Sequence, residues 1–220
     1  MKIVLRIGGS ILGSPPDGRV MTSYAGVVTD ALNRGHKVTL VVGGGSVARQ
    51  YIEAAKTMGL EHRFQDQVAI QVSRLNARLV GMSLGFPDVP VTIRGAVSRV
   101  VRDGVVVMGG LRPGITTDTV ATLVAVAWRS DVMIKASNQD GIYTADPRLH
   151  KEARLLPKVS YGMLTAILGG RHAPGIHSIV DPVAVEMIAK NKTRLVVVNG
   201  NEPRNVLRAI EGKDVGTTVG

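Results

Sequence analysis

Three glycine clusters, each directly after a short apolar run, constrain this chain more than any other feature. The clusters lie at positions 8–9, 43–45 and 109–110, and the runs at 3–7, 38–42 and 105–108 each predict a buried strand. The carboxyl ends of parallel strands share one sheet edge, where α/β proteins bind ligands. Because glycine lets backbone N–H groups approach an anion closely, several such turns predict a site for more than one phosphate.

Helical patterns alternate with these strands, which is the order of βαβ units and predicts an α/β fold with a mainly parallel sheet. In the long amphipathic segment 64–84, Val68, Val72, Leu75 and Leu79 form one stripe at helical spacing, opposite Arg74, Asn76 and Arg78. We expect the other helices at 20–33, from 45 onward, and at 117–128, 161–168, 181–189 and 203–211, with further strands at 131–136 and 194–198.

The length and composition of the chain predict a single domain over residues 1–220, because 220 residues without a repeat or a clear linker can bury one large core. No cysteine occurs, which excludes disulfides and cysteine-ligated metals. The first apolar run ends at Gly8 and is too short for a signal peptide, and no stretch approaches a membrane span. We therefore expect a cytoplasmic protein without membrane contact.

The charge balance favours an anionic partner, since 27 Lys and Arg residues against 17 acidic residues give a net charge of +10. The basic residues are dispersed, however, and one Trp, four Tyr and two Phe leave little material for stacking on bases. We therefore expect small anionic substrates and no nucleic acid partner.

The second glycine cluster joins a strand to a helix whose first amides are unpaired and dipole-positive, and Arg49 lies one turn into that helix. In the third cluster, Thr116 and Thr117 precede Asp118 at the start of another helix. Each cluster has a purely structural alternative, close strand–helix packing in the second and helix capping in the third. Neither the P-loop pattern nor the dinucleotide fingerprint is present, so any nucleotide site here is of another type.

A lysine that closes an apolar strand, Lys135, is followed closely by Asp-Gly, Tyr and Asp-Pro, and at this point the chain resembles the amino-acid kinase superfamily, within it the archaeal type of uridylate kinase. The resemblance extends from Ile3 to about Gly200. It rests on Ile-Gly-Gly-Ser at 7–10, Val-Val-Gly-Gly-Gly at 41–45 with Ala-Arg-Gln-Tyr-Ile at 48–52, Pro-Gly at 113–114 with Thr-Thr-Asp at 116–118, Asp-Gly-Ile-Tyr-Thr-Ala-Asp-Pro at 140–147 and Ser-Ile-Val-Asp-Pro at 178–182.

The resemblance implies a three-layer αβα sandwich and transfer of the γ-phosphoryl group of ATP to UMP, giving ADP and UDP in pyrimidine nucleotide biosynthesis. Mg²⁺ would accompany the ATP, and the family suggests a homohexamer. The UMP phosphate is already anionic near neutral pH. Catalysis would therefore depend on alignment and charge neutralisation rather than on a strong general base.

The motif matches also imply site residues. The ATP phosphates would meet Gly9, Ser10, Gly45 and Arg49, and the adenine nucleoside would meet Ser137, Asn138, Tyr143 and Asp146. UMP would meet Gly44, Asp66 at its ribose, and the turn formed by Gly114, Ile115, Thr116, Thr117, Asp118, Thr119 and Val120. Without the family match, Asp66 would be taken as a solvated acid on a helix face.

Arg6 departs from the family pattern, because many members have lysine at this position. Arginine keeps the charge but changes its reach and geometry. We assign Arg6 as the transition-state cation and Asp118 as the carboxylate that organises it, with Lys135 and Arg49 as alternative cations. A structural Arg6, extending from the end of its strand, is the other interpretation.

Two further functional classes stay open: a superfamily kinase with another small acid or phosphate as acceptor, and a non-catalytic nucleotide-binding subunit. No protein-held metal site is expected. His172 and His177 lack the i, i+4 spacing of a helical metal-binding pair and have no evident third ligand, so we expect a mobile loop near the nucleotide instead.

Overall fold

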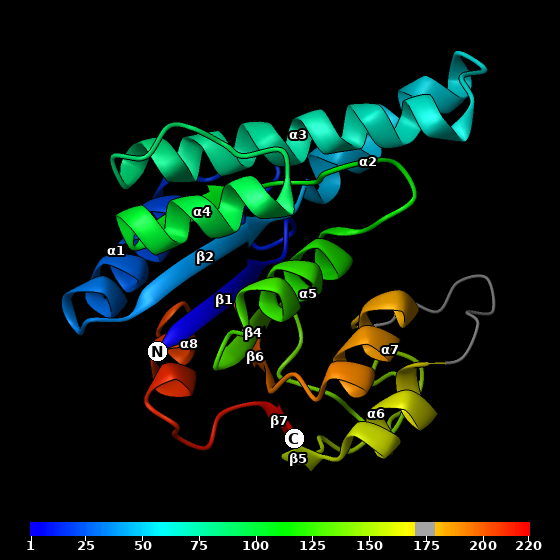
Figure 1. The fold of residues 1–220 in the computed structure, drawn as a ribbon. Coiled ribbons are helices and arrows are strands. Elements are labelled where there is room, and N and C mark those ends of the chain that lie inside the picture. Colours follow the sequence, from blue (N-terminus) through cyan, green and yellow to red (C-terminus); the bar gives the residue numbers. More distant parts are fainter. Residues whose placement is uncertain (170–178) are drawn as a thin grey trace.

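A seven-stranded sheet runs through the computed structural model, which describes residues 1–169 and 179–220 (Figure 1). The strand order is β3-β2-β1-β4-β6-β7-β5, and every neighbouring pair is parallel except β6 and β7. The strands are β1 (Lys2–Ile7), β2 (Lys37–Val42), β3 (Val105–Met108), β4 (Val132–Ser137), β5 (Lys158–Val159), β6 (Leu195–Asn199) and β7 (Thr217–Val219). The five predicted strands are confirmed within a residue at each end, whereas the short β5 and β7 were not predicted.

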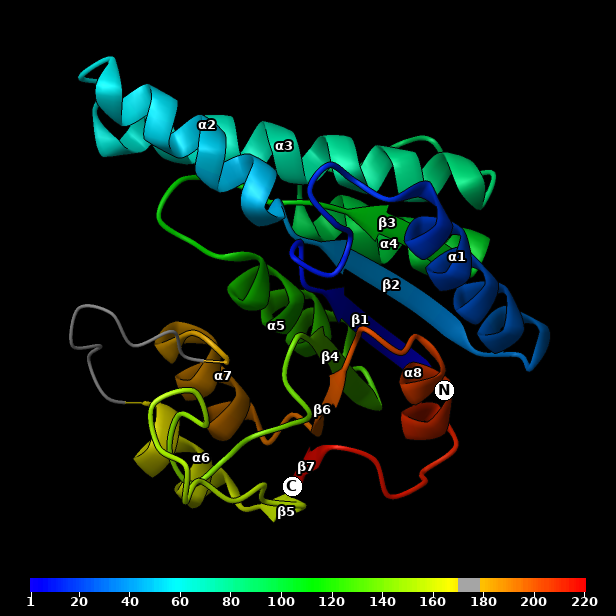
Figure 2. The same cartoon turned by 180° about the vertical axis from the view of Figure 1, so that it is seen from behind.

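Helices cover both faces of this sheet, so the predicted three-layer αβα sandwich is confirmed (Figures 1 and 2). One core joins the sheet to α1, α3 and α8, and the other joins it to α4, α5, α6 and α7. The helices are α1 (Gly18–Asn33), α2 (Gly45–Thr57), α3 (His62–Ser83), α4 (Ile93–Asp103), α5 (Thr117–Trp128), α6 (Tyr161–Leu168), α7 (Pro182–Asn191) and α8 (Arg204–Ile210).

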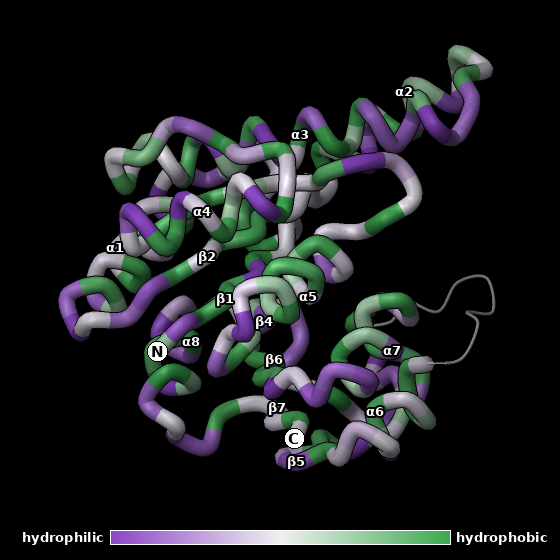
Figure 3. Tube along the Cα trace, viewed as in Figure 1, coloured by the Kyte–Doolittle hydropathy of each residue, from purple (hydrophilic) through white to green (hydrophobic). Residues whose placement is uncertain are grey.

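Side chains of β1 alternate between the two cores, as the period of a strand requires. Ile3, Leu5 and Ile7 enter the first core and Val4 enters the second, so Arg6 lies on the face of Val4. The apolar strands form the hydrophobic centre of the molecule (Figure 3). Because polar side chains are rare in this interior, the charged Arg6 at the end of β1 indicates a specialised position.

The chain leaves β1 for β2 on one side and later adds β4 on the other side, which makes the β1–β4 boundary a topological switch point. Ligands of open α/β sheets bind at the carboxyl ends of strands at such a point. The register aligns Arg6 directly with Lys135 of β4. The fold therefore brings two cations, far apart in sequence, to one end of the switch point.

The apolar stripe predicted for α3 is wrong in part. Leu75 and Leu79 are 59% and 43% exposed, whereas Ser73 and Asn76 are buried. The helix turns these polar residues toward the glycine loops, which need hydrogen-bond partners, and leaves two leucines outside. Together with α2, α3 extends beyond the sheet (Figure 1).

Helix α4 was not predicted, although its ends carry ordinary signals. The Thr92 hydroxyl accepts a hydrogen bond from the Gly95 amide at its start, and Gly104 adopts a left-handed conformation with φ 79° at its end. Its arginine-rich sequence contributes only Ala96 and Val100 as buried residues. Because its apolar face is so narrow, hydrophobic periodicity does not predict this helix.

The sheet uses strands from nearly the whole chain, from Lys2 in β1 to Val219 in β7. This continuity supports our proposal that residues 1–220 form one domain. None of the helices in the described residues is long and apolar enough to cross a membrane. His172 and His177 lie outside the described residues.

Candidate active site

The first two glycine turns interlock at the carboxyl ends of β1 and β2. A Cβ atom on Gly9 would lie 2.0 Å from the backbone nitrogen of Gly45, and Gly45 itself has φ +67°. The Gly43 amide donates to the Ile7 carbonyl at 3.0 Å, which fixes the crossing. Only glycine allows two backbones to pass this closely. The turns at 8–9 and 43–45 therefore form one continuous row of backbone amides, called here the glycine crest.

Helix α3 braces this crest and the third glycine turn. The Asn76 amide group donates to the Gly43 carbonyl at 3.0 Å, and the Ser73 hydroxyl accepts from the Gly110 amide at 2.8 Å. Arg74 donates to the carbonyls of Gly110 and Leu111, both at 2.9 Å. The sequence pattern predicts Arg74 and Asn76 on the polar face of the helix but indicates no role for them, and no motif identifies Ser73.

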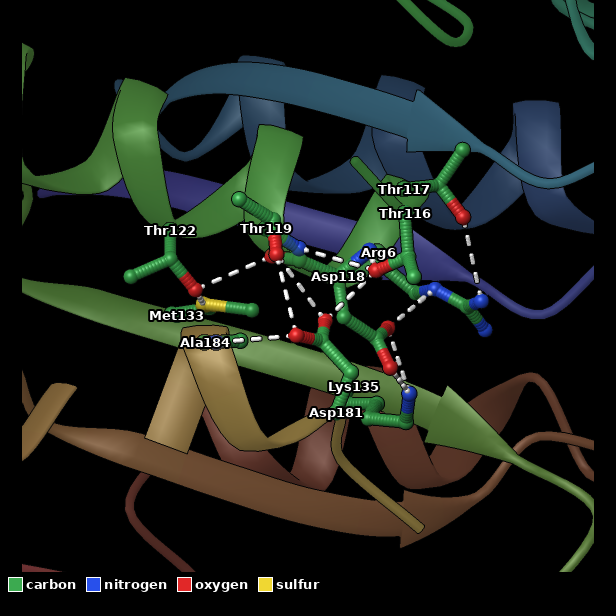
Figure 4. Close-up of polar contacts among 10 residues, drawn as sticks. All are labelled: Arg6, Thr116, Thr117, Asp118, Thr119, Thr122, Met133, Lys135, Asp181 and Ala184. Carbon is green, nitrogen blue, oxygen red and sulfur yellow. Dashed lines mark hydrogen bonds and ion pairs between the residues drawn. The ribbon is translucent and has the colours of Figure 1, made fainter. Parts of the chain in front are cut away.

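A cluster of three charged side chains lies at the switch point, where β1, β4 and the first turn of α5 meet (Figure 4). Asp118 receives the Lys135 ammonium group, whose Nζ lies 2.5 Å from each carboxylate oxygen. Arg6 approaches from the other side, with Nε 2.6 Å from Oδ1 of Asp118, and its Nη2 donates to the Thr117 hydroxyl at 3.1 Å. Two of the three candidate cations from the sequence, Arg6 and Lys135, thus share one carboxylate.

Burial sets the protonation behaviour of this cluster. Burial raises the pKa of the Asp118 carboxyl, but attraction by Arg6 and Lys135 more than offsets it and holds that pKa below its ordinary value. Burial lowers the pKa of Lys135 to about 8, with repulsion from Arg6 acting in the same direction and attraction by Asp118 opposing it. The cluster is therefore ionised near neutral pH and loses the Lys135 charge in mild alkali.

A cavity of about 680 Å³ opens over the cluster and contains part of the predicted ATP site. Gly9 and Gly45 form the crest beside it. Its lining includes the predicted residues Ser10, Arg49, Ser137 and Asn138, together with Arg6, Asp118 and Lys135.

Tyr143 and Asp146, the other two predicted ATP residues, do not line this cavity. The Tyr143 hydroxyl donates to Asp140 at 3.1 Å, and the Asp146 carboxylate pairs with Arg148 at 2.7 Å. Arg148, the partner of Asp146, lines the cavity instead, and the sequence did not identify Arg148 as a site residue. Their predicted contact with the adenine nucleoside stays a prediction.

A second cavity, of about 260 Å³, lies between α3 and the third glycine turn and contains most of the predicted UMP residues. The Asp66 carboxylate accepts the Gly114 amide at 2.8 Å, so it also holds this turn in place. The cavity also includes Arg112, which was not predicted. Its lining contains the predicted residues Gly44, Asp66, Gly114, Ile115, Thr116 and Thr117.

Thr119 and Val120 lie behind this lining rather than in it. Val120 is fully buried in the core, and the Thr119 hydroxyl donates to Asp181. Thr116 lines both cavities, which therefore adjoin at this residue, the N-cap of α5. Two adjoining cavities, with a buried cation–carboxylate cluster beside them, fit an α/β protein of the phosphotransferase class.

Comparison with known proteins gives the family. The model of the amino acid kinase family matches residues 1–199. Among curated relatives, the uridylate kinase of Methanothermobacter thermautotrophicus is 38% identical over 100% of this chain and 99% of its own length, and that of Hyperthermus butylicus is 36% identical over 99% and 97%. The chain belongs to the amino acid kinase family.

Solved structures agree with this assignment. The crystal structure of uridylate kinase from Archaeoglobus fulgidus covers 100% of both chains with a TM-score of 0.92 and 34% identity. The structure of UMP kinase from Bacillus anthracis covers 99% of this chain and 95% of its own, with a TM-score of 0.83 and 21% identity. The second likeness concerns the fold alone.

Proposed function

We propose that this chain is a UMP kinase, which transfers the γ-phosphoryl group of ATP to the phosphate of UMP and releases ADP and UDP for pyrimidine nucleotide biosynthesis. The observation that carries the proposal is the junction of the two cavities at Thr116, directly beside the Arg6–Asp118–Lys135 cluster. ATP would occupy the larger cavity and UMP the smaller one. The relatives' names support UMP as the acceptor.

Transfer would then depend on alignment and electrostatics. The glycine crest would hold the donor phosphates, and the turn from Gly114 to Thr117 would hold the acceptor phosphate. Arg6 would neutralise charge on the transferring group, while Asp118 fixes both Arg6 and Lys135 in place. Because the acceptor is already an oxyanion, no residue needs to remove a proton from it.

Mg²⁺ would enter with the ATP. The described residues contain no group of three or more His, Cys, Asp or Glu that could hold a metal ion, and Asp118 is already paired with two cations. Mg²⁺ held chiefly by the nucleotide phosphates and by water would not need such a group. When bound, the ion would neutralise phosphate charge and help to align the donor.

The proposal includes a cytoplasmic location, where ATP and UMP are available, and a homohexamer, as the family resemblance implies. Exposed apolar side chains on α2 and α3 support self-association. Leu75, Leu79 and Met82 lie at helical spacing along α3 and are 59%, 43% and 55% exposed, and Met58 at the end of α2 is 73% exposed. Exposed apolar surface of this kind is typical of interaction sites.

An acceptor panel tests the proposed reaction. With ATP and Mg²⁺, ADP release should be far faster with UMP than with acetylglutamate or aspartate, because the smaller cavity combines an acceptor-phosphate turn with Asp66. A coupled ADP assay measures the rates, and chromatography identifies UDP. Vigorous phosphorylation of acetylglutamate without any UDP would contradict the proposal.

The pH dependence of kcat/KM should show a limb near pH 8. Lys135 is a cation below its pKa of about 8 and neutral above it, so activity that needs the intact cluster should fall as the pH rises through that value. Lys135→Arg keeps the charge and should move the limb to higher pH, even if its maximal rate is lower. Identical alkaline limbs in the two proteins would assign the ionisation to another group.

A further inference from the structure

Asp181 makes more contacts than its place at the start of α7 requires. As the N-cap of that helix, it accepts the Ala184 amide at 3.0 Å through Oδ1. Its carboxylate also accepts the Thr116 hydroxyl at 2.5 Å and the Thr119 hydroxyl at 3.0 and 3.1 Å (Figure 4). Capping needs one acceptor, so the two threonine contacts demand another explanation.

These contacts join α7 to the acceptor turn. Thr116 lines both cavities, and its hydroxyl oxygen accepts the amides of Asp118 and Thr119 while its only hydrogen goes to Asp181. The orientation of this side chain is therefore fully determined. Because the same threonine caps α5, Asp181 indirectly fixes the first turn of the helix that carries Asp118.

A second path leads from Asp181 to the charged cluster. Burial and repulsion by Arg6 lower the pKa of Lys135, and the negative charge of Asp181 is among the groups that oppose this shift. Asp181 also lines the larger cavity beside Arg6 and Lys135. Asp181 thus contacts the acceptor turn and also lines the donor cavity.

We propose that Asp181 is a positioning residue, which holds the hydroxyls of Thr116 and Thr119 so that the turn before α5 is preformed to receive the acceptor phosphate. It acts through the threonines and does not itself bind the acceptor. The inference rests on the proposed function, because it takes UMP as the acceptor.

Asp181→Asn tests this role while preserving the cap, since asparagine is as good an N-cap as aspartate. Its single carbonyl oxygen cannot accept the Ala184 amide and both hydroxyls together. We expect the Kd for UMP, measured by calorimetry, to rise about tenfold, within the range of coupling energies between contacting groups. The Kd for a non-hydrolysable ATP analogue with Mg²⁺ should not rise, because Asp181 lines the donor cavity and its replacement by asparagine removes a negative charge from the site of an anionic ligand.

Thr119 supplies the matched pair. Thr119→Val removes the hydroxyl at nearly constant shape and should weaken UMP binding, whereas Thr119→Ser keeps the hydroxyl and should bind UMP close to wild type. The double variant Asp181→Asn/Thr119→Val should bind UMP no worse than Asp181→Asn alone, because both substitutions break the hydrogen bond between Thr119 and Asp181. If Asp181→Asn does not fold, judged by circular dichroism, the comparison of Val with Ser at position 119 decides.

The outcomes separate the two proposals. Normal UMP binding by wild type with unchanged affinity in Asp181→Asn and Thr119→Val would overturn the positioning role alone. A changed Mg²⁺ dependence of ATP-analogue binding with unchanged UMP affinity would also overturn it, since Asp181 would then act at the metal. No UMP binding by the wild-type chain would overturn the proposed function and this inference with it.

Discussion

Arg6→Ala and Asp118→Asn are each expected to lower kcat by about one to three orders of magnitude, the usual loss when one preorganised electrostatic group is removed. Arg6 and Asp118 form an ion pair at 2.6 Å at the junction of the two cavities. The interaction of Arg6, held in place by Asp118, with the transferring phosphoryl group should strengthen mainly in the transition state. The KM values for ATP and UMP should therefore stay comparatively close to wild type in steady-state kinetics.

Arg34→Ala is the control for this pair of variants, because it breaks an ion pair with Glu211 whose side chains are 47% and 28% exposed. It should leave kcat unchanged. Normal turnover by Arg6→Ala would move the transition-state cation elsewhere, with Lys135 the next residue to replace. A rise in KM alone in both variants would make the pair a binding feature.

Gly9→Ala is expected to abolish most ATP binding and to destabilise the fold by about 1–3 kcal/mol, the usual cost of forcing a methyl group into a packed interior. The new Cβ would lie 2.0 Å from the Gly45 nitrogen and 2.7 Å from the Gly43 carbonyl carbon. Both neighbours are backbone, so neither can rotate away. Calorimetric titration with an ATP analogue and thermal unfolding measure the two effects.

Gly26→Ala is the matched control for this substitution. Gly26 lies in α1, and no atom outside its own stretch of helix lies within 4 Å of the place that a methyl group would take. Alanine should therefore stabilise the helix by about 0.5–1 kcal/mol and leave ATP binding unchanged. Wild-type affinity in Gly9→Ala would show that the crossing of the turns can relax, and the glycine crest would lose its assigned role.

The sequence was sufficient to predict the five longer strands of the sheet and the sheet edge at which the candidate site lies. Apolar runs that end in glycine identify buried strands and their carboxyl ends, and those ends must meet on one edge when the strands are parallel. The charged cluster needed more information. Arg6 and Lys135 become neighbours only through the pairing of β1 with β4, and the order of strands in the sheet is not written in either segment.

Contacts made by helix faces were the least predictable part. On α3, periodicity favoured an inward Leu75 and Leu79, but the glycine loops need donors and acceptors, and Ser73 and Asn76 supply them from the buried side. Asp181 lies 65 residues from Thr116 in sequence, and only the packing of α7 near α5 brings them together. Such pairings depend on tertiary structure, which local patterns do not encode.

The fate of the γ-phosphoryl group is the most direct test of the central claim that two adjoining cavities align ATP with UMP. The purified chain is incubated with Mg²⁺, UMP and ATP labelled with ³²P at the γ position, and the products are separated by chromatography. The account predicts label in the β-phosphate of UDP, formed in equal amount with ADP. Label found only in inorganic phosphate, with UMP recovered unchanged, would contradict it.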